Sequence, residues 1–238
     1  MSGLSPTVVL VHGAFVDAAS WVPVAHRLLA AGHPVVVPGL SNRGLVTDAE
    51  YLRSFVEQVG GPVLLAGHGY GGVVATVAGV AESVVGLVYV ASPVLDEDES
   101  LSTVGDCFDD SDVPFLVHRR YPVEAAEDGT DLFVSPAAYG AVVAAGLPDQ
   151  VTQGLALSQR PLAANVLGEL APAAAWRSLP SWGVVPTADR LVPPDLVRSG
   201  LARAGARKVV ELDAPHLVVL THPDDVADVV VHALAELV

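Results

Sequence analysis

The segment VLLAGHGYGGVV, residues 63–74, has the pattern of a buried strand, a sharp turn and a helix. This is the layout of a nucleophile elbow, G-x-S-x-G, in which a serine at the turn exposes its hydroxyl above a parallel sheet. The flanking glycines Gly67 and Gly71 are present, but Gly69 occupies the position of the serine. Glycine adopts the strained backbone angles of such a turn at little steric cost. We therefore expect the turn to persist while the attacking hydroxyl is missing.

Three other short segments lie, like the turn at Gly69, at the carboxyl end of a predicted strand. They are His12-Gly13-Ala14-Phe15, the segment PTADRLVPP at residues 186–194, and Ala214-Pro215-His216-Leu217. The carboxyl ends of parallel strands share one edge of a sheet, and ligands bind at that edge in α/β folds. These segments are therefore candidates for a single site.

Six apolar runs, most of them rich in valine, predict strands that are buried on both faces of a parallel sheet. The runs are Thr7–Val11, Pro34–Val37, Val63–Ala66, Val85–Ala91, Ser181–Pro186 and Lys208–Leu212. The helical patterns between them are Ala18–Ala31, Asp48–Val59, Tyr70–Val80, Pro194–Ala204 and Asp224–Leu237. Thr47 with Glu50 predicts a capping box before the second helix, and Gly32 a C-terminal cap of the first. The alternation predicts an α/β fold with a doubly wound, mostly parallel sheet of about six strands.

One stretch interrupts this alternation. Residues 92–179 begin with the acidic run Asp96-Glu97-Asp98-Glu99 and are otherwise rich in alanine and helix-prone. We expect a helical lid inserted after the fourth strand, above a core formed by residues 1–91 and 180–238. The apolar side chains expected over the pocket are Leu116, Val117, Leu132, Phe133, Tyr139 and Trp176.

Composition and charge argue against several classes of function. The chain has 238 residues, 51% of them hydrophobic, and its net charge of −15 argues against nucleic acid and anionic membranes as partners. It has one cysteine, Cys107, and no metal-ligand spacing among its eight histidines, so no internal disulfide, metal or cofactor is implied. Seven glycines interrupt the apolar stretch 58–81, which therefore does not predict a membrane span. Because no secretion signal precedes the first strand, a cytoplasmic location is expected.

The four motifs, in this order along the chain, resemble those of the α/β-hydrolase superfamily, and the resemblance covers nearly the whole sequence. The chain is most similar to small bacterial members akin to plant methyl esterases and hydroxynitrile lyases. This resemblance implies that His216 is a general base oriented by Asp189, and that the amides of Ala14 and Tyr70 form an oxyanion hole. Gly69 departs from the family pattern because it occupies the nucleophile position. The expected partner is a small carbonyl or ester-like molecule.

Three aromatic or imidazole side chains are candidates for binding that molecule, namely Phe15, Trp21 and His68. Trp21 lies on an amphipathic helix and would fit the core equally well. His68, like His12, would also fit a structural role behind the site.

Three functions are compatible with these residues. The first is non-covalent acid–base catalysis by a His–Asp dyad and an oxyanion hole on a small carbonyl compound, giving water-mediated hydrolysis, cyclisation, isomerisation, elimination or carbon–carbon cleavage. The valine- and alanine-rich, lysine-poor composition is typical of a high-GC bacterium, in which such an enzyme would serve specialised metabolism. The second is a serine esterase or lactonase whose nucleophile was replaced by Gly69. The third is a ligand-binding protein without turnover.

Two other side chains, Cys107 and Ser92, could in principle replace the missing nucleophile. Neither lies on a strained turn within a motif that would aim it at His216. The sequence therefore favours chemistry without a protein nucleophile over a displaced one.

Overall fold

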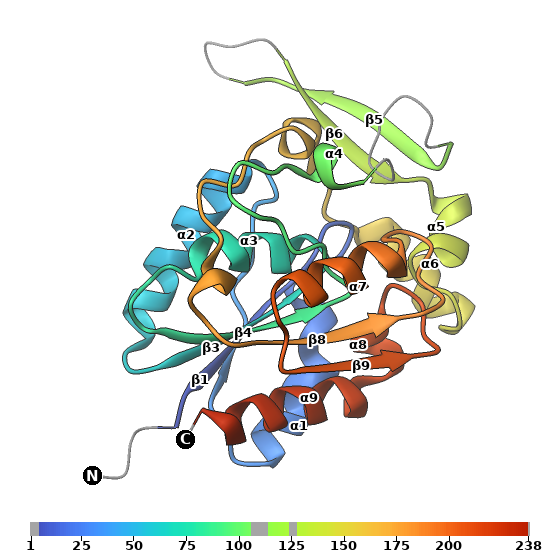
Figure 1. Cartoon of the computed structure of the whole chain (residues 1–238). Helices are drawn as coiled ribbons and strands as arrows, with labels where there is room; N and C mark the ends of the chain where they lie inside the picture. The colour runs from blue at the N-terminus through green and yellow to red at the C-terminus, as the bar shows by residue number, and fades with distance from the viewer. Residues whose placement is uncertain (1–4, 106–113, 124–127, 238) are drawn as a thin grey trace.

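The computed structural model describes residues 5–105, 114–123 and 128–237 (Figure 1). Within these ranges six parallel strands form the main sheet, in the order β2-β1-β3-β4-β8-β9. Their bounds are β1 (Thr7–Val11), β2 (Val35–Val36), β3 (Val63–His68), β4 (Val84–Val90), β8 (Ser181–Pro186) and β9 (Lys208–Leu212). The predicted α/β fold with a doubly wound parallel sheet is confirmed.

Helices cover both faces of this sheet. They are α1 (Val22–Ala30), α8 (Val218–Thr221) and α9 (Pro223–Glu236) on one face, and α2 (Leu45–Val59), α3 (Tyr70–Ala78) and α7 (Pro194–Arg203) on the other. Along β1, Val8 and Leu10 join the core on the α1 face, whereas Val9 and Val11 join the core on the α3 face. Successive residues of a strand point to opposite faces, so a sheet covered on both sides requires continuous apolar runs. Gly32, with φ +86°, follows α1 in the left-handed conformation predicted for its cap.

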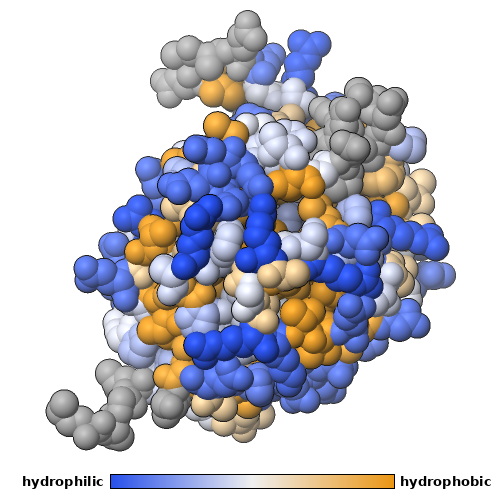
Figure 2. Space-filling view, in the orientation of Figure 1, coloured by the Kyte–Doolittle hydropathy of each residue, from blue (hydrophilic) through white to orange (hydrophobic). Residues whose placement is uncertain are grey.

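The surface mixes polar and apolar side chains. The face in Figure 2 shows hydrophobic residues scattered among hydrophilic ones, and single exposed apolar residues such as Leu29 and Leu157 are ordinary on a folded chain. In the part of the chain that the structure describes, no helix is long and apolar enough to cross a bilayer.

The insertion between β4 and β8, for which the sequence predicts a helical lid, combines helices with a small sheet. It contains the short helices α4 (Leu101–Val104), α5 (Pro136–Val142) and α6 (Asp149–Ser158). It also contains an antiparallel sheet of β5 (Leu116–Tyr121), β6 (Gly129–Val134) and β7 (Leu162–Ala163), whose first two strands project from the body in Figure 1. Strand β5 has the sequence LVHRRY and is largely exposed, so it has no run of buried apolar residues; its conformation follows from pairing with β6.

The start of α2 corrects the predicted capping box. Helix α2 begins at Leu45, so Thr47 lies inside its first turn and is not the cap. Glu169, from the insertion, takes that role, because its carboxylate accepts hydrogen bonds from the amides of Leu45 at 2.6 Å and Val46 at 3.4 Å. A carboxylate at a helix N-terminus also interacts favourably with the helix dipole. The cap of α2 thus joins the insertion to the core.

We expect Glu169→Ala to lower the free energy of unfolding by about 1 kcal/mol, because it leaves two amides of α2 without an acceptor. Thr47→Ala is the matched control on the same turn and should change it by less than about 0.5 kcal/mol. Urea unfolding followed by circular dichroism measures both. A larger loss in Thr47→Ala than in Glu169→Ala would restore the capping box that the sequence predicted.

Candidate active site

The turn between β3 and α3 has the geometry of an elbow. Gly69 has φ +51° and ψ −124°, a conformation that residues with a side chain adopt only under strain. The neighbouring backbone also approaches closely. A Cβ on Gly67 would overlap with Gly72, and a Cβ on Gly71 would overlap with the carbonyl oxygen of Val11. The flanking glycines are therefore required by packing, independently of the residue at position 69.

His216 and Asp189 form a buried pair after neighbouring strands. Asp189 follows β8 and His216 follows β9, and the imidazole Nδ1–H donates a hydrogen bond to Asp189 Oδ2 at 2.8 Å. The other carboxylate oxygen accepts from the amides of Leu191 at 2.8 Å and Val192 at 2.9 Å. Because every oxygen of Asp189 is engaged, the carboxylate is fixed in orientation. It holds the proton of His216 on Nδ1 and leaves a lone pair on Nε2.

Nε2 of His216 faces the position that a side chain on residue 69 would occupy. A Cβ built on Gly69 would lie 3.2 Å from His216 Nε2 and 3.3 Å from Cε1. The structure therefore brings together the three residues that the sequence singled out, Gly69, Asp189 and His216. Their chemical role stays a prediction.

Ala14 and Tyr70 line this space, and the backbone amide of each has no acceptor among the described residues. Tyr70 is the first residue of α3, so its amide has no acceptor within the helix and lies at the positive end of the helix dipole. Ala14 lines the same cavity, and its amide has no acceptor among the described residues, whereas the next amide, that of Phe15, donates to the carbonyl oxygen of Arg160 at 2.8 Å. Unpaired amides at such a point suit a developing oxyanion.

His12 holds the loop that carries Ala14. Its Nδ1–H donates to the carbonyl oxygen of Gly13, and its Nε2 accepts from the amide of Leu40, both at 2.9 Å. Burial lowers the pKa of His12, so the ring stays neutral and keeps one donor and one acceptor. This arrangement supports a structural role for His12.

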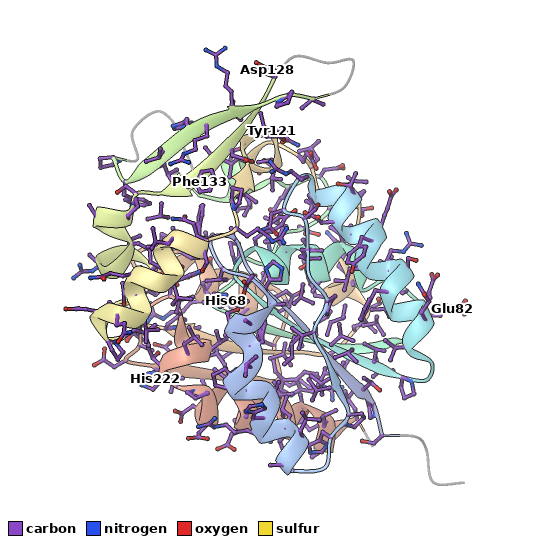
Figure 3. The ribbon with its side chains drawn as sticks, turned by 180° about the vertical axis from the view of Figure 1, so that it is seen from behind. His68, Glu82, Tyr121, Asp128, Phe133 and His222 are labelled. Carbon is purple, nitrogen blue, oxygen red and sulfur yellow. The ribbon has the colours of Figure 1, made fainter. Side chains whose placement is uncertain are left out.

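His68 and Trp21, the two other candidates for substrate contact, lie outside the described lining of the cavity and pack behind His216. His68 is fully buried, in the interior of the molecule (Figure 3), and its Nε2–H donates to the carbonyl oxygen of His216 at 2.9 Å. The Trp21 ring packs edge-on against His68, with 6.4 Å between ring centroids. Neither side chain belongs to the described lining of the cavity. His68 supports the loop that carries His216 through this hydrogen bond, and Trp21 supports the ring of His68.

A buried carboxylate behind Tyr70 was not found by sequence reasoning. Asp48, on α2, is 1% exposed and accepts hydrogen bonds from the hydroxyls of Tyr70 at 2.9 Å and Ser41 at 2.6 Å. Burial and the negative charge of Asp48 raise the pKa of Tyr70, so the phenol remains a donor. Acidic residues are common in the first turn of helices, so the sequence offered no signal that set Asp48 apart.

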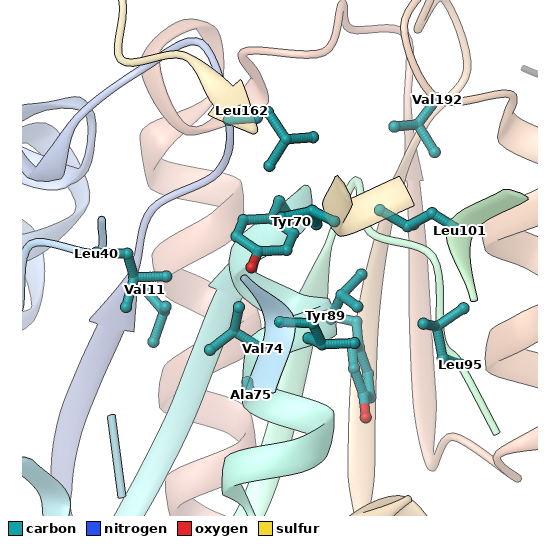
Figure 4. Packing of buried hydrophobic residues seen from close by; sticks show 14 of the residues in the cluster. Val11, Leu40, Tyr70, Val74, Ala75, Tyr89, Leu95, Leu101, Leu162 and Val192 are labelled. Atoms are coloured by element: carbon teal, nitrogen blue, oxygen red, sulfur yellow. The ribbon is translucent and has the colours of Figure 1, made fainter. Parts of the chain in front are cut away.

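An apolar cavity opens above Gly69. Figure 4 labels four of the residues that line it, namely Tyr70, Leu101, Leu162 and Val192. Its solvent-accessible volume, which counts the space open to the centres of water molecules, is about 40 Å³. The lining consists of Ala14, Phe15, Gly69, Tyr70, Pro93, Leu101, Phe115, Leu116, Leu132, Leu162, Leu167, Leu191, Val192 and His216. Of the predicted contacts, Phe15 and the insertion residues Leu116 and Leu132 line the cavity. Val117 and Phe133 instead line a separate groove on the insertion.

Ser92, one of the two other candidate nucleophiles, is not among the described residues that line this cavity. Ser92 is buried against Gly72, and its hydroxyl donates to the carbonyl oxygen of Pro93 at 2.8 Å. Cys107 lies outside the described residues. Across the described ranges, no three side chains of the His, Cys, Asp or Glu type converge in a way that could hold a metal ion.

A family model described as "Alpha/beta hydrolase family" matches residues 8–229. No curated protein matches the sequence. Among solved structures, polyneuridine aldehyde esterase is similar, with a TM-score of 0.81 and 19% identity over 98% of each chain. Tomato methylketone synthase I in complex with 2-tridecanone has a TM-score of 0.81 and 15% identity over 99% of this chain and 100% of that one. An extracellular alpha/beta-hydrolase from a Paenibacillus species has a TM-score of 0.73 and 19% identity, covering 96% and 98%. At these identities the likeness concerns the fold.

The buried His68 makes stability depend on pH. Burial, with the adjacent His216 ring, lowers the pKa of His68 from 6.5 to about 3. The unfolded chain therefore binds a proton that the folded chain refuses, and the free energy of unfolding falls as the pH drops from about 6.5 towards 3. This group contributes at most roughly 1.4 kcal/mol per pH unit. We expect His68→Gln, which retains an amide donor for the His216 carbonyl, to flatten this slope in urea unfolding at pH 7.5, 6.5 and 5.5.

The matched surface control for that experiment is His232→Gln, because His232 is partly exposed and pairs with Glu236 on α9. An unchanged slope in His68→Gln would show that the acid sensitivity arises at other groups.

Proposed function

The chain belongs to the alpha/beta hydrolase family, and from that premise we propose that it is an enzyme that performs non-covalent acid–base chemistry on a small carbonyl compound. His216 is the base, Asp189 orients it, and the amides of Ala14 and Tyr70 stabilise the negative charge that develops on the carbonyl oxygen. The observation that supports this most directly is the distance of 3.2 Å between His216 Nε2 and a Cβ position at Gly69. The base still faces the point of reaction although the nucleophile is absent.

The absent CH₂OH group leaves room for a proton donor other than serine. In one route this donor is the substrate: Nε2 takes a proton from the carbon next to the carbonyl, and the electron pair moves into an enolate held by the two amides. Return of the proton to another carbon completes an isomerisation, and loss of a leaving group completes an elimination. In the other route His216 deprotonates a water, which attacks the carbonyl of an ester directly; the bond to the alcohol oxygen then breaks, and the imidazolium returns the proton to the departing alkoxide. Neither route forms a covalent bond to the protein.

The names of two similar structures concern carbonyl compounds. One is polyneuridine aldehyde esterase, and the other is methylketone synthase I, whose structures hold 2-tridecanone or, in a variant, β-ketoheptanoate. Both names concern carbonyl compounds, which agrees with the amide pair and the base of this chain. The identities of 15–19% leave the particular reaction to be decided by experiment.

A second candidate function is that of a serine hydrolase whose nucleophile was replaced. The specific observation that favours it is the backbone of Gly69, which keeps the φ and ψ of an elbow although glycine is free to adopt others. The ligand-binding alternative is compatible with the same cavity, but it gives no reason for Asp189 to hold the tautomer of His216.

Proton exchange tests the proposed base without knowledge of the natural substrate. We expect the native chain in D₂O to accelerate deuterium incorporation next to the carbonyl of small apolar ketones, as followed by proton NMR. His216→Ala should slow this exchange by a factor of about 10² to 10⁴, the usual contribution of a general base. His232→Ala, which removes a partly exposed imidazole, should have no effect. If the native chain and His216→Ala exchange at the same rate, His216 is not the general base.

Substitutions at position 69 separate the two candidate functions. Gly69→Ser and Gly69→Ala both place a Cβ at φ +51°, so each should lose about 1–3 kcal/mol of stability by urea unfolding. Only Gly69→Ser supplies a hydroxyl within reach of His216, and it should hydrolyse p-nitrophenyl esters with a burst of nitrophenol. For a non-covalent enzyme both variants also lose ketone exchange. A native chain inert in exchange, combined with rapid hydrolysis by Gly69→Ser, would favour the replaced serine hydrolase instead.

A further inference from the structure

The cavity offers a substrate almost no polar surface besides its base. Among the described lining residues, only Tyr70 and His216 carry polar side-chain atoms. The hydroxyl of Tyr70 is turned away and donates to the buried carboxylate of Asp48 at 2.9 Å, so the ring presents carbon to the cavity. A ligand therefore finds one imidazole nitrogen, two backbone amides and otherwise hydrocarbon.

No lysine or arginine is part of the described lining. Arg43 lies nearby on the loop before α2, but it is paired with Asp131 of β6 and its guanidinium lies 4.2 Å from the centroid of the Tyr121 ring. The segments 106–113 and 124–127, outside the described residues, contain no lysine or arginine in their sequence. The described lining thus supplies no cationic side chain as a counter-ion for an anion; Arg160, whose carbonyl oxygen accepts from the amide of Phe15, is exposed and lies outside this lining.

The negative charge of the pair formed by His216 and Asp189 also disfavours an anionic ligand. When His216 is neutral, as a base must be, the pair with Asp189 carries the full negative charge of the carboxylate. Both side chains are buried, with 2% and 0% of their side-chain surface exposed, so solvent screens this charge poorly. A carboxylate entering the cavity would lose its hydration and approach a like charge, with only the two amides to compensate.

We propose that this site is selective for neutral, apolar carbonyl compounds and excludes carboxylates of the same length. The inference rests on the proposed function in that it concerns the same cavity, and it deepens it by defining the substrate class as uncharged ketones, amides and esters. It also implies that a reaction that creates a carboxylate in the cavity expels its own product.

Three ligands of equal chain length test the selectivity by calorimetric titration at pH 8, namely 2-heptanone, heptanamide and heptanoate. The two neutral compounds should bind at least about 100-fold more tightly than heptanoate, because a buried carboxylate without a partner is strongly disfavoured. Equal affinity for heptanamide and heptanoate overturns the proposal, and so does a lack of binding by both neutral compounds.

A pair of adjacent substitutions on β5 provides the control for position. Leu116 lines the cavity, whereas Val117, on the opposite face of the strand, lines the separate groove. Leu116→Lys should raise the affinity for heptanoate at least about tenfold, because it adds a cation to the wall. Val117→Lys adds the same charge outside the cavity and should leave it unchanged. If both substitutions act equally, the effect is one of net charge, and the proposed role of the cavity wall is refuted.

The two proposals fail in different measurements. If neutral ligands bind more tightly than heptanoate but exchange does not depend on His216, the proposed acid–base function is refuted. The inference about binding then still holds. Tight binding of heptanoate together with His216-dependent exchange would do the reverse.

Discussion

The hydrogen bond between His216 Nδ1 and Asp189 Oδ2 is the interaction on which the proposed chemistry of this site depends. It decides which imidazole nitrogen is unprotonated, and therefore that a base rather than a donor faces Gly69. The two residues meet because β8 and β9 are neighbouring parallel strands, paired from Trp182 with Lys208 to Pro186 with Leu212. Their loops consequently leave the same edge of the sheet. The amides of Leu191 and Val192 then fix the carboxylate, so the ring has a single orientation without any contribution from residue 69.

The elbow is held by its surroundings rather than by the residue at its centre. The amide of Gly69 donates to the carbonyl oxygen of Val90 at 3.0 Å, and its own carbonyl oxygen accepts from the amide of Gly72 at 3.0 Å. Close backbone contacts at Gly67 and Gly71 complete the turn. With glycine at position 69 the strain that a side chain would suffer is relieved, while the positions of the base and of the amides are retained. The turn therefore keeps its backbone geometry with glycine at position 69.

The sequence predicted those parts of the structure that depend on local pattern. Because helices bury both faces of the main sheet, its strands are continuous apolar runs, most of them rich in valine. The predicted bounds of strands such as β1 and β8 therefore agree with the structure at both ends. Contacts between distant segments were not predictable in this way. Glu169 caps α2 from 124 positions away, and β5 is a strand because β6 pairs with it. The motifs located His216 and Asp189, but Trp21 and Asp48 required coordinates, since an apolar ring or a first-turn carboxylate fits many environments equally well.

An apolar cavity with a single imidazole also determines at which step of the proposed reaction a bound compound can become charged. In the proposed reaction, a neutral carbonyl compound enters without the loss of an ion's hydration shell, and the negative charge arises only once His216 has taken a proton. At that moment the amides of Ala14 and Tyr70 act on an oxyanion in surroundings of low polarity, where their dipoles are effective. The imidazolium formed at the same time is stabilised by Asp189, so charge separation occurs between partners that are already in place. The lining that would exclude an anionic ligand is thus the same feature that favours formation of an anion within the bound substrate.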